Sequence, residues 1–448
     1  MFTDDWDQLT PDQRFEARMG AWLEPQGVEF AGEDARAAYR ERVTMLRDAI
    51  ELRKPARVPI APQVGLFPAR WGGLSPREAY YEPAKLREVW GRFHTEFPMD
   101  VLASSGDHVP CRIFDLLDYR LYDWPGHGVG DDSGYQYNEK EWMLADEYDE
   151  LIADPSYFWQ HTYLPRVFGE FAPMRELAPL TDVVEAPFTA PFFLPFGRPD
   201  VREMYEKLLE AGRLADEWMA AMAAMDAEVT ATLGLPALDG GATKAPYDIL
   251  GDTLRGTRGL MTDTFRRWEK VTEACERLVP IAIDAGVRAA DATRLPICFI
   301  PLHKGADGFL DERGFHELYW PTLKAVLLGL IEQGIVPRCF AEGGYATRLD
   351  AISDPDIPAG RMIWLFDATD MGEVRRRLGG HHCFSGNVPG ALFSLGDPAQ
   401  MDDYVRRLID DVAGDGGFIL GSGVVLDEAI TECVKTFMEA GLRYGAEA

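Results

Sequence analysis

Cysteine is scarce and scattered in this chain. Six cysteines occur in 448 residues, at positions 111, 275, 298, 339, 383 and 433, and no two of them form a Cys-x-x-Cys pair. Disulfide scaffolds and zinc ribbons both require closely spaced cysteines. The sequence therefore predicts reduced thiols, as in a cytoplasmic protein, and excludes a fold that depends on disulfide bonds.

Positive charge is also in short supply. The chain has 45 lysines and arginines against 74 aspartates and glutamates, which gives a formal net charge of -29. A surface of this sign repels the phosphate backbone of nucleic acids and the headgroups of anionic lipids. We therefore expect neither a nucleic acid nor a membrane as a partner, and the acidity itself is typical of a well-solvated surface.

Long apolar runs and targeting signals are missing. The chain contains no stretch of about 18 apolar residues, the length that spans a membrane. The segment from Met1 to Trp6 is acidic and lacks the basic and apolar regions of a secretory signal peptide. We expect a cytoplasmic protein.

Nucleotide-binding signatures are missing as well. No Gly-x-Gly-x-x-Gly follows a predicted strand, and no Gly-x-x-x-x-Gly-Lys-Ser/Thr occurs. These glycine-rich turns let a backbone approach phosphate groups closely. Their absence removes the main support for a nucleotide-binding fold.

What the chain does have is an alternation of short apolar strands with amphipathic helices. Strands are predicted at 296–303, 335–342, 362–367, 382–387 and 417–421. Earlier strands at 57–62, at 98–103 and near 235 bring the total to about eight. Apolar strands that alternate with helices indicate a parallel sheet, and eight such units favour a closed (β/α)8 TIM barrel of the α/β class over a doubly wound sheet.

Two segments of the single predicted domain, 1–448, stand outside this alternation. Residues 1–55 form a helical extension, with a helix predicted from Glu33 to Leu52. Residues 106–180 are rich in Asp, Tyr, Trp and Gly, and we predict an insertion over the barrel mouth. A surface excursion packed on its own aromatic residues is the open alternative. Its Trp and Tyr side chains suit an aromatic or apolar ligand, although such residues also simply pack.

Polar residues follow several of the predicted strands. The active site of a TIM barrel lies at the carboxyl ends of its strands. There, His303 and Lys304 end one strand, Glu342 ends the next and Asp367 the one after. We predict these four as catalytic residues, because together they can donate and accept protons on a bound ligand. Whether His303, Glu342 and Asp367 hold a metal ion is left open.

A second set of residues is predicted to bind the substrate. It consists of Asp248, Arg255, Tyr345, Asn387 and Ser422, all close to the predicted strand ends. Arg255 and Arg258 have the spacing to clamp a carboxylate through bidentate hydrogen bonds. Ion pairs with Asp248 and Asp252 are the open alternative.

Several motifs together resemble the uroporphyrinogen decarboxylase superfamily. They are Arg57-Val-Pro59, Asp100 to Ser105, Ala245-Pro246, Phe315-His-Glu-Leu-Tyr-Trp-Pro321, Gly334-Ile-Val-Pro337, Gly386-Asn-Val-Pro389 with Gly396-Asp-Pro398, and Gly416-Gly-Phe-Ile-Leu420. The resemblance covers most of the chain outside residues 106–180. It implies a TIM barrel and a divergent member related to the methylcobalamin:coenzyme M methyltransferases.

The chain departs from two branches of that superfamily. The decarboxylases carry an Arg-Gln-Ala-Gly-Arg signature where this chain has Ala61-Pro-Gln63-Val-Gly-Leu66, which disfavours an octacarboxylate substrate. The zinc methyltransferases carry His-x-Cys and a further Cys where this chain has Phe340-Ala-Glu342 and Ser422. A zinc site that activates a thiol needs soft thiolate ligands. The sequence therefore disfavours thiol alkylation on zinc.

The function that the resemblance implies is chemistry on a small molecule. We expect transfer of a C1 group, as in a methyltransferase or demethylase, with no intrinsic cofactor. The chain has no Asp-x-His-x-x-Gly motif, so a corrinoid would come on a separate partner protein. The alternatives are a decarboxylase (a lyase) that uses acid–base catalysis and a non-catalytic barrel that binds a ligand. A homodimer is left open.

Overall fold

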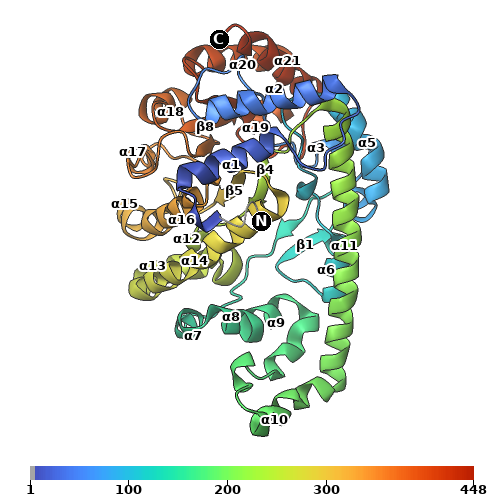
Figure 1. Ribbon diagram of the computed structural model, residues 1–448. Coiled ribbons are helices and arrows are strands. Elements are labelled where there is room, and N and C mark those ends of the chain that lie inside the picture. Colours follow the sequence, from blue (N-terminus) through green and yellow to red (C-terminus); the bar gives the residue numbers. More distant parts are fainter. Residues whose placement is uncertain (1–5) are drawn as a thin grey trace.

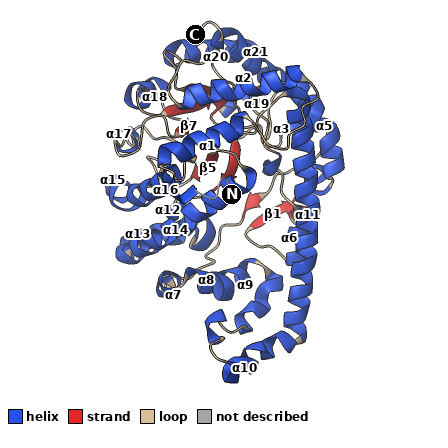
Figure 2. Ribbon diagram, viewed as in Figure 1, coloured by secondary structure: helices blue, strands red, loops and turns tan. Residues whose placement is uncertain are grey.

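The computed structural model describes residues 6–448, except for the side chain of Phe188. The expectation that no signal peptide is present concerns mainly residues 1–5 and lies outside the described residues. Figure 2 shows strands in the interior of the larger part of the molecule, with helices around them.

Six parallel strands form one sheet in the order of the sequence. They are β4 (Asp239–Ala242), β5 (Ile297–Leu302), β6 (Val336–Ala341), β7 (Ile363–Phe366), β8 (Cys383–Val388) and β9 (Phe418–Ser422). Every residue of β6, β7, β8 and β9 is buried, as expected for strands covered on both faces. The five strands predicted after residue 291 are therefore confirmed to within one residue at each end.

Two extended segments close this sheet into a barrel. Ile60 pairs in parallel with Leu420 of β9, and the Asp100 amide donates to the Ile60 carbonyl at 2.9 Å. The Leu102 amide donates to the carbonyl of Pro236, just before β4, at 2.8 Å. The segments predicted as strands at 57–62 and 98–103 thus occupy the first two positions of the ring, although neither forms a regular strand over its predicted length.

The helices that follow the strands surround the barrel. They are α3 (Phe67–Trp71), α4 (Pro76–Tyr81) and α5 (Pro83–Glu96); α12 (Pro246–Ile249), α13 (Gly256–Arg266) and α14 (Trp268–Thr293); α15 (Glu312–Gly314), α16 (Trp320–Glu332), α17 (Leu349–Ile352) and α18 (Met371–Leu378); and α19 (Gly390–Ser394), α20 (Pro398–Val412) and α21 (Thr431–Gly445).

The N-terminal helices α1 (Pro11–Leu23) and α2 (Glu33–Ile50) cover the amino end of the barrel. Their apolar faces form one buried cluster with the beginnings of five strands: Phe15, Met19, Trp22, Tyr39, Val43 and Leu46 with Ile297, Val336, Ile363, Cys383 and Ile419. In Figure 1 both helices cross in front of the sheet. Because they close this end, the carboxyl ends of the strands are left for a site.

The predicted insertion divides into two parts, of which the first lies on the rim of the barrel mouth. It contains α6 (Cys111–Leu117) and a small sheet of β1 (Tyr122–Pro125), β2 (Gly128–Val129) and β3 (Gln136–Tyr137). On one side Arg77 contacts Asp131 at 3.1 Å, and on the other the Trp142 amide donates to the Leu254 carbonyl at 2.8 Å. This part therefore reaches from the loops after the first strand to the loop after β4.

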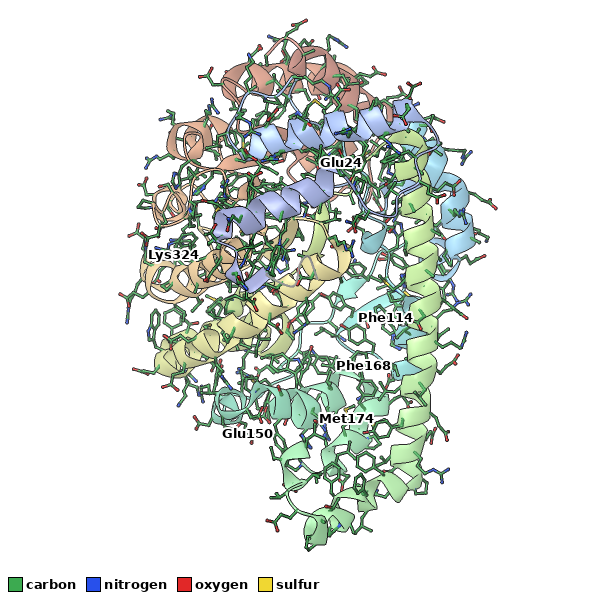
Figure 3. The ribbon with its side chains drawn as sticks, in the orientation of Figure 1. Glu24, Phe114, Glu150, Phe168, Met174 and Lys324 are labelled. Atoms are coloured by element: carbon green, nitrogen blue, oxygen red, sulfur yellow. The ribbon has the colours of Figure 1, made fainter. Side chains whose placement is uncertain are left out.

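The second part extends away from the barrel. It contains α7 (Tyr148–Ala153), α8 (Pro155–Phe158) and α9 (Leu164–Val167). The excursion continues past the predicted bound at residue 180 through α10 (Thr189–Phe193), and it runs beside the long helix α11 (Pro199–Leu233). Figure 3 shows Phe168 and Met174 on the side of this part that faces α11. Both side chains pack against a small cluster separate from the barrel core, which includes Leu117 and Met204.

The structure also bears on the scarcity of cysteine and on the lack of long apolar runs. All six cysteines are buried and none is in a disulfide bond. Within residues 6–448, no helix combines the length and the apolar character that a membrane crossing requires.

The N-terminal cap of helix α20 can be tested by mutation. Asp397 accepts a hydrogen bond from the Gln400 amide at 2.9 Å, and Pro398 occupies the first helical position. Removing the capping oxygen leaves a helix-end amide without its partner, so we expect Asp397→Ala to lower the free energy of unfolding by about 1 kcal/mol. Urea denaturation measures this change. Asp397→Asn, which keeps a capping oxygen, is the control, and an equal loss in both variants would contradict the role of the cap.

Candidate active site

The centre of the candidate site is a chain of three side chains at the carboxyl ends of the strands. His303 follows β5 directly and Glu342 follows β6 directly. The Nδ1 atom of His303 lies 2.5 Å from Oδ2 of Asp252, and its Nε2 atom lies 3.4 Å from Oε1 of Glu342. The prediction that His303 and Glu342 lie close together is confirmed, and Asp252 is a partner that the sequence did not single out as a site residue.

Two lysines converge on the same aspartate. Lys304 Nζ lies 3.0 Å from Oδ1 of Asp252, and Lys244 Nζ lies 2.5 Å from Oδ2. Lys304 comes from the end of β5, whereas Lys244 lies in the loop after β4. The carboxylate of Asp252 is therefore held by three cationic or hydrogen-bonding groups, and Lys244 is a second residue that sequence reasoning missed.

These contacts set the protonation of His303. Burial favours the neutral ring, but the hydrogen bonds to Asp252 and Glu342 and their negative charges outweigh it and raise the pKa of His303 to about 9. Burial would also raise the pKa of Asp252, yet His303 and the two lysines hold that pKa well below its ordinary value. At neutral pH the site thus contains an imidazolium beside a carboxylate.

Asp248 is buried next to this group and holds the segment that follows β5. Its side chain is fully buried, accepts a hydrogen bond from the Lys304 amide at 2.8 Å and accepts another from the Tyr319 hydroxyl at 2.7 Å. Burial and the nearby charge of Asp252 raise the pKa of Asp248 to about 6. The structure therefore shows Asp248 positioning the backbone after β5, and its contact with a substrate stays a prediction.

Arg255 does not form a substrate clamp. Its side chain is 2 % exposed, and its Nε atom lies 2.6 Å from Oδ2 of the equally buried Asp263. It also contacts Glu141 and the carbonyl of Met143, both from the insertion. Arg255 thus ties the rim of the insertion to α13, and both of its predicted roles, as a clamp and as a partner of Asp248 or Asp252, are corrected.

The remaining three predicted substrate residues are also buried and engaged within the protein. The Tyr345 amide donates to Thr369 Oγ1 at 3.0 Å and its ring is not exposed, and the Asn387 amide group donates to the carbonyl of Asp367 at 3.0 Å. Ser422 Oγ accepts from the Gln63 amide at 3.0 Å. Asn387 and Ser422 thus connect neighbouring strand ends through their side chains, and Tyr345 does so through its backbone amide. That these three residues bind the substrate stays a prediction.

Asp367 lies beside Glu342 and bonds to the backbone of Gly343. Its side chain is half-buried, and its Oδ2 atom accepts a hydrogen bond from the Gly343 amide at 2.9 Å. Burial and the charge of Glu342 raise the pKa of Asp367, while the Gly343 amide opposes the shift. Asp367 therefore adds a negative charge beside Glu342 without contacting His303 in any recorded hydrogen bond or ion pair of the described residues.

A further carboxyl group comes from the loop after the second strand position. Burial, together with the charges of Asp239 and Asp427, raises the pKa of Asp107 to about 7, and Arg338 opposes this shift. Arg338 is itself engaged, because its Nε atom donates to Asp239 at 2.8 Å. The sequence did not single out Asp107.

The predicted metal ligands are not arranged as a set. Among the described residues, no group of three or more His, Cys, Asp or Glu side chains is positioned to hold a metal ion. His303, Glu342 and Asp367 therefore do not form a ligand set in this structure. What the arrangement can do is deliver and accept protons.

Comparison with known proteins agrees with this architecture. Residues 201–444, more than half of the chain, match the family described as Uroporphyrinogen decarboxylase (URO-D). The chain belongs to the URO-D family. Its resemblance to that family, read from scattered motifs, is thereby confirmed.

One solved structure of low sequence identity supports the fold. A methyltransferase from Methanosarcina mazei is 11% identical, with a TM-score of 0.55 over 91% of this chain and 98% of that chain. A B12-independent methionine synthase from Shewanella sp. W3-18-1, in complex with selenomethionine, is 13% identical over 46% of this chain and 60% of that chain, with a TM-score of only 0.30. No curated protein matches the chain. The predicted TIM barrel is confirmed by the family and the first of these structures.

Proposed function

We propose that this URO-D family member is an enzyme of the methyltransferase or demethylase type, which removes a C1 group from a small molecule with His303 as general acid. The observation that carries the proposal is the Asp252–His303–Glu342 chain at the strand ends. Its imidazolium has a pKa of about 9 and is therefore loaded with a proton at neutral pH. A demethylation that leaves an alkoxide or amide-like atom needs such a proton donor.

Each residue has a defined part in this proposal. Asp252 accepts a hydrogen bond from Nδ1 of His303, and this bond orients the ring so that Nε2 points towards Glu342. The leaving atom would take the Nε2 proton, and Glu342 stabilises the charged ring before that transfer. Lys304 and Lys244 keep Asp252 ionised. A corrinoid on a separate protein would supply the methyl-accepting cobalt.

Decarboxylation would need the same proton donor, but it would also need a site that binds a carboxylate. A substrate carboxylate needs cationic groups that are free to bind it. Here Lys244 and Lys304 lie on Asp252 and Arg338 lies on Asp239. The lysines and the arginine named here are thus already paired with carboxylates, so methyl transfer is the function that we favour.

The Glu342→Gln variant tests the proposal. We expect turnover to fall by about 100-fold or more, because the proton on His303 loses a stabilising charge. The thermal midpoint should stay nearly unchanged, since Glu342 is 41% exposed and makes one ion pair. The assay supplies a purified corrinoid protein and a panel of methyl ethers and methylated amines, and it monitors CO2 release in parallel.

The matched control is Glu439→Gln, which changes an exposed glutamate of α21 in the same way. It should keep full turnover. Full methyl transfer in Glu342→Gln would refute the part assigned to Glu342, and CO2 release without methyl transfer would replace the proposal by the decarboxylase alternative.

A further inference from the structure

The interior of the barrel is open to solvent on the side of β4 and β5. A Cβ atom at Gly241 would meet Ala289 of α14, so Gly241 faces the helices and the next residue, Ala242, faces the barrel interior. Ala242 pairs in register with Phe299 of β5, which therefore faces inwards together with Pro301. Ala242 is exposed and both of these β5 residues are partly exposed, whereas the other residues of β5 are buried. We call the space that these three inward side chains line the inner hollow.

The inner hollow is closed at the amino end of the barrel and opens towards the candidate active site. Ile297 and Val336, at the beginnings of β5 and β6, are buried in the cluster that α1 and α2 cover. His303 follows Phe299 by four residues on the same strand, which corresponds to about 13 Å at the usual rise of a strand. A small molecule that extends inwards from His303 therefore meets Phe299 and its neighbours.

An arginine–aspartate pair forms the floor of the inner hollow. Arg338 of β6 pairs in register with Phe299, and its guanidinium carbon lies 4.6 Å from the centre of the Phe299 ring. The Nε atom of Arg338 donates a hydrogen bond to Asp239 at 2.8 Å, and Nη2 donates to the other carboxylate oxygen. The Asp239 side chain is 26% exposed although it lies inside the ring of strands. This exposed surface faces the inner hollow, because the amino end of the barrel is closed.

One donor of this pair has no partner inside the protein. The Nη1 atom of Arg338 makes no hydrogen bond with any other part of residues 6–448. It is also not among the fully buried atoms of these residues that lack a partner, so solvent reaches it. The pair therefore presents an N–H donor and two carboxylate oxygens to the inner hollow, while its net charge is zero.

The charges between the floor and the rim balance as well. Three cationic side chains lie among three carboxylates: His303, Lys244 and Lys304 among Asp252, Glu342 and Asp367. Between these charges and the floor, Phe299 and Pro301 give the wall an apolar surface. A charged ligand would lose its hydration there without gaining an unpaired partner, so the inner hollow suits an uncharged molecule.

We infer that Arg338 and Asp239 bind the uncharged polar end of a small molecule, namely a carboxamide or hydroxyl group on an apolar body. Nη1 of Arg338 donates to the oxygen of that group, and Asp239 accepts its N–H or O–H hydrogen. A carboxylate in the same place would lie against Asp239 and has no hydrogen to donate, so it is rejected. That the bound molecule is the substrate of His303 rests on the proposed function; that the floor binds it does not.

Titration calorimetry with two probes of nearly equal shape tests the inference. Benzamide carries an uncharged carboxamide on an apolar ring, and benzoate carries a carboxylate in its place. We expect benzamide to bind and benzoate to bind at least about tenfold more weakly, because hydrogen bonds to charged groups are among the stronger ones. Equal affinity for both probes would overturn the inference. So would the absence of benzamide binding at about 50 mM, well above the millimolar weak end of ligand affinities.

A variant of the floor locates the binding. Arg338→Lys keeps a cation beside Asp239 but replaces the fork of the guanidinium by a point charge, so benzamide binding should weaken by about tenfold. Arg361→Lys is the control, because Arg361 also lies over a ring, 3.8 Å from the centre of Phe15, and pairs with Asp12 at 2.9 Å, but it precedes β7 at the amino end. Thermal midpoints identify a variant that fails to fold. Unchanged benzamide binding in Arg338→Lys would refute the floor as the binding site.

A thiol placed in the inner hollow tests it without altering the floor. All six native cysteines are buried, and burial raises the pKa of Cys298, which lies next to α14, to about 12. The unaltered protein should therefore resist methyl methanethiosulfonate, whereas Pro301→Cys should be modified, at a rate that benzamide lowers. Mass spectrometry measures the extent of modification. An unreactive thiol in folded Pro301→Cys would contradict the open hollow, and Phe299→Cys provides the same test if Pro301→Cys does not fold.

These measurements need neither turnover nor a corrinoid. Benzamide binding that depends on Arg338, together with no methyl transfer from the panel of methylated compounds, would uphold the inference and reject the proposed function. Methyl transfer without benzamide binding would do the reverse.

Discussion

The His303→Gln variant is expected to lose about 10²- to 10⁴-fold in kcat, which is the usual contribution of a general acid. Glutamine keeps the size of the side chain and part of its hydrogen bonding to Asp252 but carries no proton that it can release. The measurement is kcat in the methyl-transfer assay, with the thermal midpoint recorded for the same preparation. The matched control is His316→Gln, because His316 is exposed at the start of the helical segment after β5 and has no part in the site.

The pH profile separates proton donation from a structural role. Since the pKa of His303 is raised to about 9, the active imidazolium is present at lower pH and is lost as the pH rises through about 9. We expect kcat to fall along an alkaline limb near that value. Asp252→Asn removes the hydrogen-bonded charge that supports the raised pKa, so its limb should move to lower pH. A flat profile from pH 7 to pH 10 would show that His303 does not act as the acid.

Replacing Arg255 by methionine is expected to lower the free energy of unfolding by about 3 kcal/mol, the lower end of the range for breaking a buried ion pair. The reason is that Asp263 is 1% exposed and would keep its charge without its closest partner. Arg267 lies 2.9 Å from the other carboxylate oxygen and the Tyr148 hydroxyl 3.0 Å from the shared one, which limits the loss. The shift of the urea midpoint measures the effect.

Arg258→Met provides the comparison. Arg258 is exposed three residues further along the same helix, and it makes no recorded ion pair within the described residues. Its replacement should leave the urea midpoint unchanged. If Arg255→Met were as stable as the unaltered protein but bound its substrate poorly, the clamp predicted from the sequence would be restored and the structural role of Arg255 would be refuted.

The strand-end residues show how much of the site could be predicted from the sequence. In a parallel barrel the carboxyl ends of neighbouring strands meet, so a residue that directly follows a strand has a known place. This is why His303 and Glu342 were correctly expected close together, and their Nε2–Oε1 distance is 3.4 Å. The residue before the next helix is fixed just as locally: Asp370, immediately before α18, accepts a hydrogen bond from the Glu373 amide at 2.8 Å.

The same rule does not fix the direction in which a side chain turns. Asn387, near the end of β8, donates from its side chain to the carbonyl of Asp367, and Tyr345, in the loop after β6, is buried and bonds to Thr369 through its backbone amide. Asp248 and Arg255 lie in the loop and helix after β4, where side-chain direction depends on what packs against them. For Arg255 that partner is the insertion, more than 100 positions away in the sequence.

The sequence by itself determined the alternation of strands and helices, the parallel barrel, the helical extension and the strand-end pair, because these follow from local periodicity and from the direction of the chain. Only the tertiary structure decided that Asp252 and Lys244 join the site and that α7 to α10 extend along α11. The physical reason is that loops take their conformation from non-local contacts, whose partners carry no shared signal in the sequence.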